Sequence, residues 1–128
     1  MLDKCLLRLI DGTEPSTAHV CHDELMTALS TARIRAIHIT GSSDNLALPI
    51  FSEGIDALNR ALTRRDDGAG WLLEPDDVLA LQDALDAYSV VLLASSPLQM
   101  QIAWEAHHAE LLRELDEIEK KQFTELAV

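Results

Sequence analysis

Apolar positions recur three and four residues apart over four stretches of the chain, the spacing that stacks side chains on one face of a helix. The recurring residues are Ala18, Cys21, Leu25, Ala28 and Ala32 in the first stretch, Phe51, Ile55, Leu58 and Leu62 in the second, Val78, Leu81, Leu85, Tyr88 and Leu92 in the third, and Trp104, His108, Leu111, Leu115 and Ile118 in the last. This pattern predicts one helix that begins near residue 16 and three more at about 49–64, 75–94 and 98–123.

Local signals mark where these helices begin. Pro49 suits the first turn of the second helix. Asp76 and Asp77 suit the start of the third, where the helix dipole favours anions. Ser96 and Gln99 have the spacing of a capping box, which predicts that the last helix starts directly after Ser96. Residues typical of turns separate the stretches, at 11–16, 41–45 and 66–70.

Two segments can be interpreted either as strands or as helices. Residues 2–10 are a short apolar run without a helical stripe, and such runs do not discriminate between the two. Residues 33–40 contain the β-branched Ile34, Ile37, Ile39 and Thr40, so we predict a short strand there, with a continued helix as the alternative. Both strands together would form a small β element near the N-terminus and make the fold α+β.

The last predicted helix has a coiled-coil-like row of apolar residues, spaced four and three residues apart from Trp104 to Ile118. We expect Trp104 to be buried in this row. Leu98, Ile102, Ala109 and Leu112 widen the row, so the helix should touch two neighbours. Because only a few residues join the last two helices, we predict that they form an antiparallel hairpin. The predicted fold is mainly α: one domain over residues 1–128, built as a compact bundle of three to four helices.

Composition limits the kind of protein this can be. The chain has 128 residues, of which 48% are hydrophobic and only 4% aromatic, so the core should be aliphatic. Its two cysteines, Cys5 and Cys21, are too few for a disulfide framework. The sequence shows no signal peptide and no stretch approaching 18 apolar residues, so we expect a soluble, cytoplasmic protein that does not bind membranes.

The charge is strongly acidic and unevenly distributed. The chain has 22 acids and 10 bases, which argues against direct binding to nucleic acid, where phosphates require a surplus of Lys and Arg. Thirteen of the acids but only one base, Arg113, lie between residues 66 and 119. We therefore expect a non-catalytic module that binds a basic partner protein through Asp76, Asp77, Asp83, Asp86, Glu110, Glu114, Asp116, Glu117 and Glu119.

The expected partner is a nucleic-acid-handling protein or a toxin. The module would act as an inhibitor that mimics nucleic acid, as an immunity-type protein, or as a chaperone. No nucleophile elbow, phosphate-binding loop or other catalytic motif occurs in the sequence, so no catalytic residue and no cofactor are predicted. An acidic face that only keeps the protein soluble is the simplest alternative.

One alternative is a metal-binding helical bundle or a small enzyme that uses Glu105, His107 and His108, and another is self-association. Glu105 and His108 have the spacing found in di-iron bundles, and His107 is adjacent, but one such pair is too few for a site unless a symmetric dimer supplies a second. The cluster from His19 to Glu24 is interpreted as surface histidines beside the buried Cys21. Arg60, Arg64 and Arg65 should pair locally with Asp66 and Asp67, or else contact the acidic hairpin of another copy in a homodimer. A purely structural homo-oligomer is a further alternative.

Overall fold

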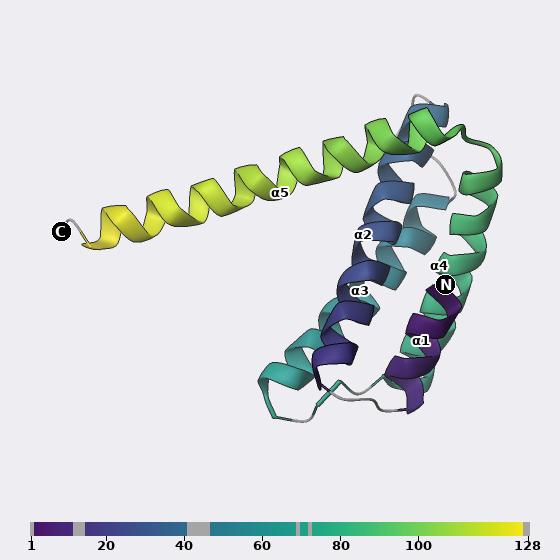
Figure 1. Cartoon of the computed structure of the whole chain (residues 1–128). Coiled ribbons are helices and arrows are strands. Elements are labelled where there is room, and N and C mark those ends of the chain that lie inside the picture. Colours follow the sequence, from purple (N-terminus) through teal and green to yellow (C-terminus); the bar gives the residue numbers. More distant parts are fainter. Residues whose placement is uncertain (1, 12–14, 41–46, 69, 72, 127–128) are drawn as a thin grey trace.

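The computed structural model describes residues 2–11, 15–40, 47–68, 70–71 and 73–126. They form the helices α1 (Leu2–Asp11), α2 (Pro15–Thr40), α3 (Ala47–Asp66), α4 (Pro75–Leu93) and α5 (Pro97–Leu126). Figure 1 shows α1 to α4 gathered in one bundle, while α5 leaves it and extends to the C-terminus. The predicted mainly α bundle is confirmed. Residues 12–14 of the turn predicted at 11–16, and the whole turn predicted at 41–45, lie outside the described residues. Residue 11 ends α1, and residues 15 and 16 begin α2, so the predicted turn was too long.

The strand predicted at residues 33–40 is wrong, as is the β element near the N-terminus. Both segments are helical, and the described part of the chain contains no strand. Ala32 and Ala36 are both almost fully buried and continue the inward face of α2 beyond the β-branched residues. Because strand propensity is weak and depends on context, this packing decides the conformation.

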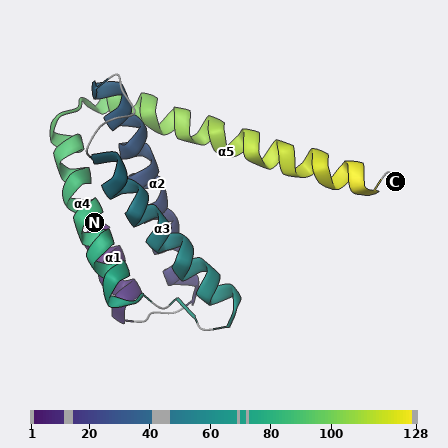
Figure 2. The same cartoon turned by 180° about the vertical axis from the view of Figure 1, so that it is seen from behind.

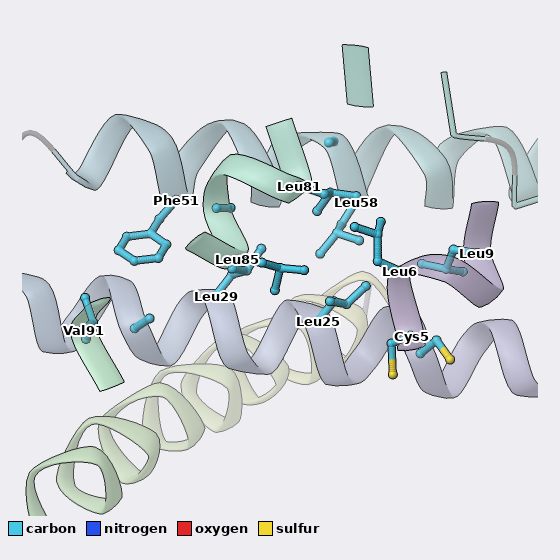
Figure 3. Packing of buried hydrophobic residues seen from close by; sticks show 14 of the residues in the cluster. Cys5, Leu6, Leu9, Leu25, Leu29, Phe51, Leu58, Leu81, Leu85 and Val91 are labelled. Carbon is cyan, nitrogen blue, oxygen red and sulfur yellow. The ribbon is translucent and has the colours of Figure 1, made fainter. Parts of the chain in front are cut away.

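The core lies between α2, α3 and α4, with α1 closing one side (Figure 2). Five large side chains of this core have no exposed surface, and they are Leu25, Leu29, Phe51, Leu58 and Leu81. Figure 3 shows these side chains pointing toward one another from the three helices. The prediction of an aliphatic core is therefore confirmed, and the burial of such side chains supplies most of the stability of a small domain.

Gly54 allows α3 and α4 to pack closely. A Cβ atom on Gly54 would lie 2.7 Å from the Cβ of Ala84 and 3.2 Å from the Cδ1 of Leu29. No carbon pair tolerates 2.7 Å, so a glycine at this position is required by the distance between the helices. The cost of glycine within a helix is offset by this close packing.

The last two helices do not form the predicted hairpin. α5 crosses α2 instead of packing along α4, and its buried residues are Ala103 and His107. The short joint keeps the ends of α4 and α5 together but does not set their angle. Arg35 on α2 donates a hydrogen bond of 2.9 Å to the hydroxyl of Ser95 in this joint, which favours the crossing. Trp104, expected to be buried, remains 40% exposed.

Candidate functional site

The second half of α5 stands clear of the bundle. Every residue from 109 to 126, here called the arm, is exposed. At a rise of 1.5 Å per residue the arm is about 27 Å long. Figures 1 and 2 show it projecting away from the other four helices in both views. An exposed helix of this length receives little stabilisation from tertiary packing, yet it carries many large apolar side chains.

Two rows of residues run along the arm. Leu111, Leu115 and Ile118, here called the inner row, follow at spacings of four and three and are 41%, 57% and 52% exposed. The outer row consists of Leu112, Asp116, Glu119 and Phe123, which follow at i, i+4, i+7 and i+11 and therefore share another face. Sequence periodicity found the inner row, but it could not show that the row lacks a neighbour within the bundle.

The acids predicted to bind a partner fall into two groups. Asp76, Asp83 and Asp86 are exposed on α4 at the surface of the bundle. Five others are exposed on the arm, and they are Glu110, Glu114, Asp116, Glu117 and Glu119. Because α5 diverges from α4, the structure does not bring the two groups together on one face (Figure 1).

Asp77 belongs to neither group, because it is buried. Its carboxylate accepts hydrogen bonds from Arg60 at 2.8 Å, from Arg64 at 2.6 Å and from the amide of Glu74 at 3.1 Å. Burial alone would raise the pKa of Asp77, but these hydrogen bonds and the nearby charges outweigh it and lower the pKa below its usual value. Asp77 therefore joins α3 to the start of α4 and is not available to a partner.

Arg60, Arg64 and Arg65 are each paired with an acid, although Arg60 remains half exposed. Arg60 and Arg64 pair with Asp77, and Arg65 makes the predicted local pair, at 2.7 Å from Asp66. No signal in the sequence distinguishes Asp77 from Asp76. The three arginines therefore leave little free positive charge with which to bind an acidic surface of another copy.

The histidines of α2 differ from the prediction in one respect. His19 is exposed and lies 3.3 Å from Asp23, as expected of a surface residue. His22 is buried and donates a hydrogen bond of 2.9 Å to the carbonyl of Leu58. Trp71, which follows α3, packs on the His22 ring with 4.9 Å between the ring centroids. This cluster ties the α3–α4 connection to α2, which is a structural role.

The residues considered for a metal site do not converge. Glu105 is exposed and accepts a hydrogen bond of 3.3 Å from Gln101. His108 instead stacks on Trp104, with 3.8 Å between the two ring centroids. His107 is buried, and burial together with the neighbouring His108 lowers its pKa. Across the described ranges, no group of three or more His, Cys, Asp or Glu side chains is placed to hold a metal ion.

Clefts flank the root of α5 on both sides. One has a volume of about 640 Å³ and is lined by apolar residues that include Tyr88, Leu92, Met100 and Trp104. The other has a volume of about 570 Å³ and lies where the arm leaves α2 and α3. Its lining includes Met26, Arg33, Ile34, Ile37, Ile55, His107, Leu111 and Glu114. The second cleft continues into the face of the arm that carries the inner row.

Comparisons with protein families, with curated proteins and with solved structures found no match for this chain. Within the part of the chain that the structure describes, no helix combines the length and apolar character required to cross a membrane. The functional interpretation therefore depends on the geometry of the arm and on the chemistry of its two rows.

Proposed function

We propose that the protein is a non-catalytic binding module of the cytoplasm that uses its arm to bind a basic surface of another protein. The observation that carries this proposal is the outer row, where two acids, Asp116 and Glu119, lie between the large apolar side chains of Leu112 and Phe123 on an exposed helix. Leu112 is 65% exposed and Phe123 is 75% exposed. Exposed apolar side chains beside charged ones are typical of protein interaction sites.

The two kinds of side chain have different roles in binding. The acids of the arm attract a basic surface over a distance and raise the rate of encounter, whereas the apolar side chains provide affinity once the surfaces meet. Between Glu105 and Glu119 the chain has six acids and one base, Arg113. The field around the outer row is therefore negative, and a partner with Lys and Arg around an apolar depression complements it.

The acids of α4 are a second candidate for the same role, because α4 carries a row of the same kind. Leu79, Asp83, Asp86 and Val90 follow there at the spacing of the outer row, and Leu79 and Val90 are 59% and 67% exposed. We place the partner on the arm because the arm stands clear of the bundle, whereas α4 is packed in it. A partner held on the arm would have its basic surface covered by carboxylates where it would otherwise meet phosphates. This fits an inhibitor or a chaperone of a nucleic-acid-handling protein or a toxin.

The test compares two variants that each remove two negative charges. Asp116→Asn with Glu119→Gln changes the outer row, and Asp83→Asn with Asp86→Asn is the matched control on α4. Each full-length protein serves as bait in extract of the source cell at low and at high salt, and the captured proteins are identified. We expect one basic protein to be captured by the parent and by the α4 variant, to be lost with the arm variant, and to elute at high salt.

Phe123→Ser tests the apolar contribution of the outer row, and it should weaken capture without changing the salt dependence. Equal loss of capture with the α4 and the arm variants would mean that net charge alone is responsible. Retention of capture with the arm variant, or capture of no basic protein by the parent, would overturn the proposal.

A further inference from the structure

The inner row is a second, separate feature of the arm. Its spacing of four and three extends from His108 through Leu111, Leu115 and Ile118 to Gln122. This is the spacing at which two helices wind around each other with their apolar side chains interdigitated. Leu111 still borders the 570 Å³ cleft beside α2 and α3. Leu115 and Ile118 lie farther along the arm and are more than half exposed.

Two charged residues flank the inner row on one edge. Glu114 and Lys121 are seven residues apart and therefore lie on the same side of the helix. Among the described residues neither of them takes part in a salt bridge, whereas Lys120 pairs with Asp116 at 3.1 Å and Arg113 approaches Glu110 at 4.0 Å. Apart from Arg113, the bases of the arm are Lys120 and Lys121, which follow its acids from Glu110 to Glu119.

We infer that the arm pairs with the arm of a second copy of this chain, in antiparallel orientation. Centring the pair between Asp116 and Glu117 places Leu115 against Ile118 of the second copy, and Leu111 against Gln122. The same register places Glu114 beside Lys121 of the second copy, and symmetry creates this attraction twice. The charge pattern of the arm therefore complements itself when one copy is reversed.

The parallel arrangement is disfavoured by the same charges. In a parallel pair Glu114 lies beside Glu119 of the second copy, and this repulsion also occurs twice. The antiparallel register overlaps residues 109–124 of both copies, which is nearly the whole arm. The end of each arm then reaches the 570 Å³ cleft at the root of the other, where Ile34 and Ile37 contribute to the lining.

Pairing through the inner row does not occupy the outer row. Glu119 lies beside Leu112 of the second copy, and the two outer rows come to the same side of the pair. That side retains Asp116 and Glu119 from both copies. The inference therefore does not depend on the proposed function, and the two can be tested separately.

Sedimentation equilibrium of the full chain tests the pairing. We expect the mass to rise with concentration from the chain mass of 14.1 kDa to twice that value. Leu115→Asp should give a monomer at all concentrations, because it places a charge at the centre of the apolar contact. Circular dichroism checks that each variant keeps its helix content, which we expect because Leu115 lies on the exposed arm.

Charge exchange determines the orientation. Glu114→Lys and Lys121→Glu should each raise the dissociation constant by about tenfold or more, and the double variant should restore the parent value. In a parallel pair Glu114→Lys alone would strengthen the association. That result would overturn the inference. So would a monomeric parent, a dimer that persists in Leu115→Asp, or a double variant whose dissociation constant does not return to the parent value. Asp116→Asn with Glu119→Gln should still dimerise, which separates this test from that of partner binding.

Discussion

Arg64 on α3 donates a hydrogen bond of 2.6 Å to the carboxylate of Asp77, which is buried at the start of α4. The Asp77 side chain is only 3% exposed, whereas Arg64 keeps contact with solvent. This hydrogen bond to Asp77 raises the pKa of Arg64, so both groups stay charged at neutral pH. A residue that appears in the sequence as one of many surface acids thus fixes the relation between two core helices.

Replacing Asp77 with alanine should destabilise the fold. The change leaves Arg60, Arg64 and the amide of Glu74 without their acceptor, and we expect a loss of about 3 kcal/mol, the lower end for breaking a buried ion pair. Urea unfolding measures this loss. The adjacent Asp76→Ala is the matched control and should change stability by less than about 0.5 kcal/mol. Equal effects of the two substitutions would show that Asp77 has no special role.

Adding one methyl group at Gly54 should also be unfavourable. Alanine is better than glycine in a helix by about 1 kcal/mol, but overpacking a core costs about 1–3 kcal/mol. Because the new Cβ would lie 2.7 Å from that of Ala84, we expect Gly54→Ala to lower the melting temperature. Adding Ala84→Gly to Gly54→Ala should recover part of the loss. A melting temperature that rises in the single variant would contradict this packing.

The aromatic residues Phe51 and Trp104 should differ strongly in their contributions to stability. Phe51 is fully buried, so Phe51→Ala should cost roughly 3–5 kcal/mol. Trp104 is 40% exposed and stacks on His108 at the root of the arm, so Trp104→Ala should cost clearly less. Chemical unfolding of both variants under the same conditions tests the difference. If Trp104→Ala lost more unfolding free energy than Phe51→Ala, Trp104 would have to be buried in the bundle, which would contradict the position of α5 described above.

Signals that act over a few residues were predictable from the sequence. The capping box at the start of α5 forms as expected, with Ser96 and Gln99 exchanging hydrogen bonds of 2.8 and 3.1 Å. The direction of α5 was not predictable, because it involves contacts with α2 that are distant in the sequence, among them the hydrogen bond from Arg35 to Ser95, 60 residues later. An amphipathic pattern shows that a helix has an apolar face, but it does not show what covers that face.

The stability of the fold should decrease at acid pH because of His107. Burial and the adjacent His108 lower the pKa of His107 below its usual value of 6.5 in the folded chain. As the pH falls, the unfolded chain therefore binds a proton first, and stability is lost from about pH 6.5 down through the lowered pKa. Above that range the effect is absent.

Unfolding free energies at several pH values measure this loss for the parent and for His107→Gln. The variant should lose less stability than the parent between neutral and mildly acidic pH, whereas His38→Gln, at an exposed position, should behave like the parent. An identical pH dependence for the parent and His107→Gln would assign the loss to other groups.

Cys5 should be unreactive in the folded protein. Burial, with contributions from the neighbouring Cys21 thiol and from Glu24, raises the pKa of Cys5 to about 12. Because the thiolate is the reactive form, a disulfide-exchange reagent at pH 8 should label neither buried thiol quickly in the native chain, and should label both after denaturation. Fast labelling of the native chain would mean that α1 opens readily from α2.

The candidate site was predictable in composition but not in arrangement. Sequence analysis located the acids and the apolar row of the last helix, because both follow from residue spacing. It assigned them to one acidic hairpin, since short connections usually produce antiparallel neighbours. The separation of Asp83 on α4 from Asp116 on the arm follows from the crossing of α5 over α2, which depends on Ala103 and His107 at the contact.

The uninterrupted helix of the arm fixes the distance between its tip and the bundle. Each residue adds about 1.5 Å of length and about 100° of rotation. The length of the arm and the direction in which the side chains at its tip point therefore cannot change independently. Deleting seven residues would shorten the arm by about 10 Å and nearly preserve the direction of both rows, whereas deleting one would turn every later side chain to another face. The distance from the bundle to anything bound at the tip is therefore set in steps of two helical turns.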